Sequence, residues 1–159
     1  MEIHPPLVAR PNRVPQTIMK NEDSEKQKNA ESFLACLRTR DWAGLESLLA
    51  ESVVWSLPGQ GVISGEAYGP AAIVHRAQTI VSYGINFELK HILIGQHGVA
   101  LSLHNTARRE DAVLDEYLAT VMTLRNGKIA AIDTYLSDLR ALNTFFTEPK
   151  IGPALATRL

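Results

Sequence analysis

Apolar residues recur along this chain first with the period of helices and later with the alternation of strands. From residue 24 onward a single apolar stripe repeats every three or four positions and consists of Ala30, Phe33, Leu34 and Leu37. This spacing predicts a helix with one buried face. Residues 1–22 hold four of the eight prolines and show no such period, so we expect an extended or disordered arm there.

Shorter elements follow the first helix. Asp41 is a typical N-cap, and we expect it to start a second short helix carrying Trp42, Leu45, Leu48 and Leu49. Residues 52–58 are an apolar strand that stops at a proline, and residues 59–65 are expected to form a loop. Gly69-Pro70 then opens a third helix that runs to about Ser82, because proline is tolerated in a first turn.

Four strands are predicted at residues 85–94, 99–109, 113–125 and 128–136, joined by "GQHG", "REDA" and "RNGK". Asp138 is expected to cap a last short helix through Phe146, and residues 148–159 to form a tail. Helices followed by a long antiparallel meander predict a single α+β domain over residues 23–147, whose sheet curls around the helices.

The faces of the first hairpin follow from its turn. If the loop has three residues with Gly98 in the left-handed conformation, one face is apolar and carries Phe87, Leu89, His91, Leu93, Leu101, Leu103, Asn105 and Ala107. His104 then points outward. A two-residue loop would mix the two faces and bury Glu88 and Lys90, which is costly. We therefore expect the three-residue loop.

The third strand brings a carboxylate to the inner face. Its apolar residues point inward, so Glu116 and Thr120 must point inward with them. A short "ED" connection places Asn105 opposite Glu116, with His91 within diagonal reach. Three polar side chains are thus predicted to meet on an apolar concave face.

The last hairpin leaves two alternatives. A two-residue type I′ turn at "NG" puts Asp133 and Tyr135 inside, whereas a three-residue loop closed by a glycine bulge puts Ile132, Thr134 and Leu136 inside. We favour the glycine bulge, because its inner face is the more apolar one.

The composition disfavours nucleic acid and anionic membranes as partners, and it excludes an internal disulfide. Lys and Arg number 16 against 17 Asp and Glu, so no basic field favours nucleic acid or an anionic membrane surface. The single cysteine, Cys36, excludes an internal disulfide and is expected in the core. No apolar run has the length of a membrane span and the N-terminus does not resemble a signal peptide, so we expect a cytoplasmic protein.

The sequence predicts neither a metal nor another cofactor. His91, His97 and His104 are spread across one hairpin, and no carboxylate–histidine motif accompanies them. A glycine-rich phosphate loop after a strand and a Gly-x-Ser-x-Gly elbow are both missing from the sequence.

Over about residues 25–147 the chain resembles the SnoaL-like proteins of the nuclear transport factor 2 and ketosteroid isomerase superfamily. The resemblance rests on "VVWSLPG", followed by a glycine and a helix, and on "VMTLRNGKIAAIDTYLSD". It implies a cone-shaped fold, in which N-terminal helices close a curved antiparallel sheet over an apolar cavity, and a homodimer through the outer face of the sheet. Members include steroid isomerases, polyketide cyclases, epoxide hydrolases, dehydratases and non-catalytic binding modules, so the fold alone does not name a reaction.

Two mechanisms known in the superfamily do not carry over to this chain. A steroid isomerase needs a carboxylate base, a tyrosine and a protonated aspartic acid. The matching positions here are Leu57, Phe33 and Thr120. The limonene epoxide hydrolase type uses an arginine flanked by two aspartates. Its matching positions are Arg109, Ala107 and Thr134.

Glu116 is the first candidate for chemistry. A carboxyl group in an apolar cavity has a raised pKa and can serve as general acid or base, unless it is solvated at the cavity mouth. His91 is a candidate acid–base partner, although a histidine among Leu and Phe is also typical of a packed core. Asn105 is expected either to orient a substrate carbonyl or water, or to hydrogen-bond Glu116.

Other residues are expected to bind the ligand. Trp55 and Tyr68 border the predicted entrance, where one or both can stack on a ring, although packing alone also explains Trp55. The predicted walls are Leu103, Leu118, Thr120, Met122 and Thr134. We hypothesise a cofactor-independent enzyme that isomerises, cyclises, dehydrates or hydrolyses an apolar, ring-containing metabolite. The alternative is a non-catalytic ligand-binding or dimerisation module of the same fold.

Overall fold

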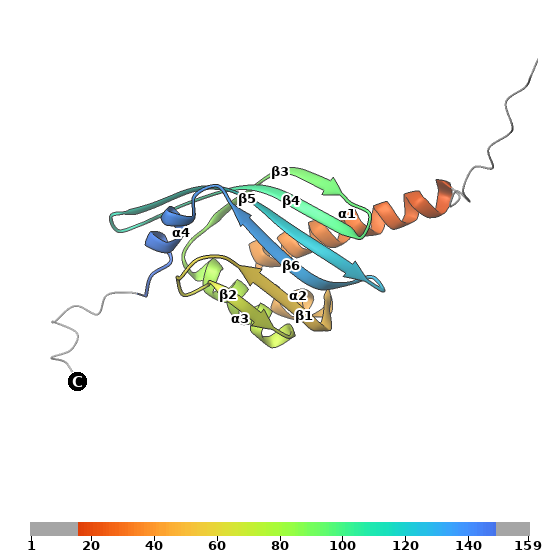
Figure 1. Ribbon diagram of the computed structural model, residues 1–159, viewed down its shortest axis with the longest axis horizontal. Coiled ribbons are helices and arrows are strands. Elements are labelled where there is room, and N and C mark those ends of the chain that lie inside the picture. Colours follow the sequence, from red (N-terminus) through yellow and green to blue (C-terminus); the bar gives the residue numbers. More distant parts are fainter. Residues whose placement is uncertain (1–15, 149–159) are drawn as a thin grey trace, which may run out of the picture.

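One six-stranded sheet curves around the helices of this protein (Figure 1). The computed structural model describes residues 16–148. Its helices are α1 (Gln16–Thr39), α2 (Trp42–Ser47), α3 (Pro70–Ser82) and α4 (Leu139–Phe145). Its strands are β1 (Leu49–Leu57), β2 (Gly65–Tyr68), β3 (Asn86–Ile94), β4 (Gly98–Arg109), β5 (Ala112–Arg125) and β6 (Lys128–Leu136). The predicted α+β class is therefore confirmed.

The strand order in the sheet is β2-β1-β6-β5-β4-β3. β1 runs parallel to β6, and every other neighbouring pair is antiparallel. α1 packs on β3 and β4, α3 packs on β1 and β2, and α4 packs on β5 at one end of the sheet. The helices thus cover the concave face that the strands enclose.

The helical stripe predicted in α1 forms the centre of the core. Ala30, Phe33, Leu34 and Leu37 are all buried against the sheet. Burial of a Phe or Leu side chain contributes roughly 1.5–3 kcal/mol to folding, so this face fixes α1 across the mouth of the sheet. On the same face of α1, one turn before Ala30, Lys26 donates hydrogen bonds to the carbonyls of Gly95 and Gln96 at the tip of the first hairpin.

Several element boundaries differ from the sequence prediction. α1 begins at Gln16, so residues 16–22 are helical where an extended arm was expected. Residues 21–25 are exposed, and an exposed helical turn leaves no apolar period to find. β2 was missed because it has four residues with a single buried one, Ala67. Residues 1–15 of the predicted arm and 149–159 of the predicted tail lie outside the described residues.

The first hairpin has a two-residue turn, contrary to prediction. Gly95 N–H donates to Gly98 O at 2.9 Å, which leaves Gln96 and His97 as the turn. Gly98 does not adopt a positive φ. What requires glycine there is a close approach, since a Cβ would lie 1.9 Å from the carbonyl oxygen of Met122 on β5.

A β-bulge at Lys90 reconciles this turn with an apolar inner face. Leu89 lies opposite Leu103, but His91 lies opposite Ser102, so one extra residue enters β3 between them. Before the bulge, Phe87 and Leu89 face inward as predicted. After it the faces are exchanged, because a shift of one residue moves side chains to the other face. His91 is exposed, and its predicted inward orientation is wrong.

The last hairpin likewise combines a two-residue turn with a β-bulge. Asn126 and Gly127 have φ of 52° and 75°, as a two-residue type I′ turn requires, so the predicted three-residue loop is wrong. A bulge at Ala130, two residue pairs from the turn, then restores the other register. Thr134 therefore faces inward as predicted, together with its β6 neighbours Ile132 and Leu136, and Asp133 is exposed.

Gly98→Ala should destabilise the protein, because the new Cβ meets backbone rather than a flexible side chain. We expect the free energy of unfolding to fall by about 1–3 kcal/mol or more, as measured by urea denaturation. Gly95→Ala in the same hairpin is the matched control, since its nearest atom lies 3.6 Å away. Equal stability of the two variants would contradict the close approach.

Candidate functional site

A cavity of about 50 Å³ lies between the concave face of the sheet and the helices. Apolar side chains from α1, α3 and α4 form its helical side: Phe33, Leu34, Leu37, Ile80 and Leu142. The sheet contributes four polar side chains: Asn105, Glu116, Thr120 and Thr134. All four are buried. The site is thus an apolar chamber in which a few polar groups are placed on the sheet.

The strand register arranges the sheet side of the cavity in three rows. Asn105 of β4 lies opposite Glu116 of β5. The next inward row consists of leucines: Leu103, Leu118 and Leu136. The third row brings Thr120 opposite Thr134. Because inward residues repeat every second position, neighbouring rows are about 6.5–7 Å apart, and apolar leucines separate two polar ends.

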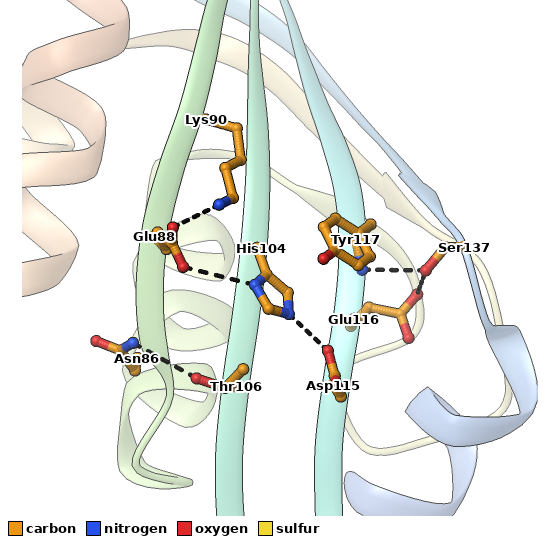
Figure 2. Close-up of polar contacts among 9 residues, drawn as sticks. All are labelled: Asn86, Glu88, Lys90, His104, Thr106, Asp115, Glu116, Tyr117 and Ser137. Carbon is orange, nitrogen blue, oxygen red and sulfur yellow. Dashed lines mark hydrogen bonds and ion pairs between the residues drawn. The ribbon is translucent and has the colours of Figure 1, made fainter.

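Glu116 is the most buried ionisable group of the site, at 1% exposure. Its Oε1 accepts a hydrogen bond from the backbone N–H of Asp138 at 2.8 Å. The same oxygen accepts a second one from Ser137 Oγ at 3.4 Å (Figure 2). Its Oε2 has no partner. Asp138 is also the N-cap of α4, so the carboxyl group is held at the start of this helix.

Burial raises the pKa of the Glu116 carboxyl above its ordinary value. The hydrogen bonds from Asp138 and Ser137 act in the opposite direction and only partly offset the loss of solvation. The group therefore holds its proton to a higher pH than an exposed glutamate does. A carboxyl in this state is suited to donate a proton and to take one back.

Asn105 faces the same space as Glu116. It is 8% exposed, and its Oδ1 is buried without a hydrogen-bond partner. The two opposed side chains do not hydrogen-bond each other, since Glu116 Oε2 also lacks a partner. Asn105 was expected either to orient a substrate or to hydrogen-bond Glu116. The hydrogen bond to Glu116 is absent, so the amide is available to a ligand in the cavity.

Trp55 is a fixed part of the cavity wall. Its Nε1 donates to Thr134 Oγ1 at 2.9 Å, and its ring lies edge-on to Phe33 with centroids 6.1 Å apart. The guanidinium of Arg76 lies over the ring, 5.5 Å from its centroid. These three contacts pack Trp55 into the wall. Of the two roles predicted for it, packing and stacking on a ligand ring, the contacts agree with packing.

Arg76 is a buried residue that sequence reasoning missed. It donates to the backbone carbonyls of Trp55 at 2.8 Å and Gly65 at 2.9 Å, and so ties α3 to β1 and β2. Burial lowers the pKa of its guanidinium, and the nearby Glu66 opposes this effect. Its signal in the sequence was a charged residue on the apolar face of a helix, between Ile73 and Ala77.

Three residues predicted for the site do not line the cavity. His91 is turned outward by the bulge at Lys90. Tyr68 is 70% exposed, because Ala67 takes the inward position opposite Trp55 and neighbours on a strand face opposite ways. Met122 is buried but lies beyond the Thr120 row, outside the cavity lining.

The outer face of the sheet carries a separate polar cluster (Figure 2). His104 faces outward as predicted, with Nε2 2.5 Å from Asp115 Oδ1 and Nδ1 3.5 Å from Glu88 Oε2. Its ring stacks on Tyr117 with centroids 4.3 Å apart. The cluster links β3, β4 and β5 across their outer side. A homodimer through this face stays a prediction.

Most of the positions that match the superfamily's known catalytic groups line the cavity. Leu57, Phe33 and Thr120 all line the cavity, so the place of the steroid isomerase groups is occupied by two apolar residues and one threonine. Arg109 lies outside the cavity lining, with its guanidinium 4.3 Å from the ring centroid of Tyr83.

Within residues 16–148 no cluster of three His, Cys, Asp or Glu side chains is placed to hold a metal ion. None of the helices in the described part of the chain combines the length and apolar character needed to cross a membrane.

Comparison with known proteins agrees with this architecture. The family model of the SnoaL-like domain matches residues 30–132. The structure of Bal32a, from a soil-derived mobile gene cassette, superposes with a TM-score of 0.69 at 28% identity, covering 77% of this chain and 98% of that one. An NTF2-like protein from Burkholderia xenovorans gives 0.69 at 22% identity, covering 79% and 98%.

An LEH-like epoxide hydrolase from M. tuberculosis superposes with a TM-score of 0.61 at 15% identity, covering 79% of this chain and 91% of that one. At this identity the likeness shows the fold alone. None of the curated proteins compared with the chain matches it.

Thr134→Val should destabilise the protein, because it removes the acceptor of the buried Trp55 indole N–H. We expect a loss of about 1–3 kcal/mol in the free energy of unfolding, measured by urea denaturation. Thr134→Ser keeps the hydroxyl and is the control. If Val and Ser variants are equally stable, the hydrogen bond does not hold the indole.

The raised pKa of Glu116 predicts a pH-dependent stability. The folded state binds the proton more tightly than the unfolded state, so this contribution is complete below the unfolded pKa of about 4.3 and is lost as pH rises through the folded pKa. The loss amounts to about 1.4 kcal/mol for each pH unit that separates the two pKa values.

Glu116→Gln cannot ionise, so the difference in free energy of unfolding between this variant and the wild type should shift in favour of the variant as pH rises from 4. Denaturation at a series of pH values measures this difference. A difference that does not change with pH would show that the carboxyl has an ordinary pKa.

Proposed function

The chain belongs to the SnoaL-like domain family, and on that premise we propose that it is a cofactor-independent enzyme that moves a proton on a small apolar molecule. The observation that supports this proposal is the Glu116 carboxyl. One of its oxygens is fixed by the Asp138 N–H, and the other meets the cavity without a partner. The expected substrate is an apolar, ring-containing metabolite.

The arrangement suits a single carboxyl acting alternately as base and acid. Protonated Glu116 donates its proton through Oε2 to one atom of the bound molecule, and the resulting carboxylate removes a proton from a second atom. Such a transfer is balanced without a cofactor and describes an isomerisation. Cyclisation, dehydration and hydrolysis use the same acid–base group. Because His91 is exposed, Glu116 acts without the histidine partner that the sequence had indicated.

Asn105 and the leucine row are proposed to position the substrate. Asn105 lies directly opposite Glu116 and offers an amide to a polar group of the substrate. Leu103 and Leu118 contact the apolar part of the substrate. Water is largely excluded from such a chamber, so the electrostatic effect of each polar group is stronger than in solvent.

Glu116→Gln tests the catalytic role. Small ring-containing molecules that raise the melting temperature are first identified and then assayed for turnover. We expect the variant to lose at least about 100-fold in kcat, because proton transfer by a side chain contributes this much, while its Kd for the same molecule changes by less than about threefold.

Glu51→Gln is the matched control, since it makes the same change at an exposed position of β1 and should keep its activity. A Glu116→Gln enzyme with unchanged kcat would refute the proposal.

The small size of the cavity favours a second candidate, a non-catalytic module of the same fold. The cavity holds about 50 Å³, whereas sites for drug-sized ligands usually have roughly 300–1,000 Å³. If no small molecule shifts the melting temperature, this alternative is supported, and binding to a protein partner becomes the question to test.

A further inference from the structure

Two unpartnered atoms in the cavity specify the kind of polar group that fits between them. In the portion of the chain that the structure describes, Asn105 Oδ1 and Glu116 Oε2 are the buried side-chain atoms without a hydrogen-bond partner. Leaving such an atom unpaired costs roughly 1–3 kcal/mol. Nearly all buried polar groups in folded proteins are paired, so an unpaired couple aimed into one cavity points to a missing occupant.

The strand register places this couple within reach of one small group. Asn105 and Glu116 are directly opposed on β4 and β5, and both face the cavity. Opposed residues of antiparallel strands have Cβ atoms about 4.5–5.5 Å apart. The nearby donors, Asp138 N–H and Ser137 Oγ, are already used by Oε1 of Glu116. The missing partner must therefore come from the ligand or from water.

We propose that the cavity binds a small neutral alcohol, with its hydroxyl group between Asn105 and Glu116. This inference rests on the proposed function, because it names the substrate class of the same site. Protonated Glu116 donates from Oε2 to the hydroxyl oxygen, and the hydroxyl hydrogen is donated to Asn105 Oδ1. One O–H group satisfies both atoms, since a hydroxyl is a donor and an acceptor at once.

A ketone, an ammonium group and a hydrocarbon each fit these two atoms less well. A ketone oxygen accepts from protonated Glu116 but has no hydrogen for Asn105 Oδ1. An ammonium group donates only, so it requires Glu116 to be ionised. The burial that raises the pKa of Glu116 opposes that state. A hydrocarbon satisfies neither atom.

The rest of the cavity sets the size and polarity of the molecule. Directly beside the Asn105–Glu116 row lie Leu103 and Leu118, and Leu34 and Phe33 face them from α1. These side chains provide apolar contact on both sides. A volume of about 50 Å³ exceeds the roughly 10–15 Å³ that one water molecule needs, but it is small for a larger ligand. The alcohol is accordingly a compact one.

Two matched sets of probes test the head group at two sizes. The first set is cyclohexanol, cyclohexanone, cyclohexylamine and methylcyclohexane, which share a six-membered ring. The second set is propan-2-ol, acetone and propan-2-amine. Dissociation constants are measured on the full chain by NMR titration. We expect the alcohol of at least one set to bind at least about tenfold more tightly than its ketone and its amine.

A ketone or an amine that binds as tightly as its alcohol would overturn the proposal. So would the absence of binding by both alcohols, because the cavity would then hold water only.

Asn105→Leu removes the amide and keeps the number and branching of the side-chain heavy atoms. The advantage of the alcohol over the ketone should fall below about twofold, because the acceptor for the hydroxyl hydrogen is gone. Methylcyclohexane should bind no more weakly than to the wild type. Asn105→Ala also removes the acceptor and replaces the leucine variant if that one does not fold. Asn86→Leu makes the same change at an exposed position of β3 outside the cavity lining, so it is the control and should keep the full advantage.

Glu116→Gln separates this inference from the proposed function. Its amide oxygen can accept from Asp138 N–H, and its NH₂ group then donates toward the cavity, so the preference for alcohols should persist. If turnover is lost but alcohols have no advantage, only the ligand class is wrong. If alcohols keep their advantage while Glu116→Gln keeps its turnover, the ligand class stands and the catalytic role falls.

Discussion

The strict alternation of side chains across a strand is the constraint on which this structure depends. The concave face must stay apolar along strands whose pairing is set at their tips by two-residue turns. In the β3–β4 and β5–β6 hairpins the turn alone would direct the wrong residues of β3 and β6 inward in the part of the strand beyond the bulge. One extra residue, Lys90 in β3 and Ala130 in β6, corrects the register in each case. The position of each bulge then decides which side chains reach the cavity.

The same constraint explains why one pair of polar residues remains inside. Along β5 every second residue from Leu114 to Met122 faces inward, and all of them except the half-buried Leu118 are buried, Glu116 included. The free-energy cost of burying its carboxyl is reduced at one oxygen only, Oε1, which accepts a hydrogen bond from a backbone N–H at the start of α4. On the other side the carboxyl faces Asn105 across a cavity, and no protein group completes its hydrogen bonds. The least satisfied point of the interior is therefore also the point at which a ligand gains most.

Much of the fold could be predicted from the sequence, because long periodic segments carry a strong signal. The third helix, the last helix and four of the strands lie within one or two residues of their predicted positions. The inward orientation of Glu116 and Thr120 followed from alternation, and that of Asn105 and Thr134 followed from choosing the more apolar face of each hairpin. What failed was turn chemistry: "QHG" and "NG" each allow loops of two or three residues, and a bulge leaves no mark in the sequence. His91 was misplaced for this reason.

The bulge at Lys90 also has a consequence for how related chains should be compared. Gain or loss of a single residue near this position would exchange the inner and outer faces of the four residues that follow, without any change in their identity. Two homologues could thus keep the same letters in aligned columns and present different surfaces to the interior. In an alignment of this region, an insertion or deletion should be treated as a change in the face of the sheet on which the following side chains lie. Only then can the role of a residue be transferred from one protein to another.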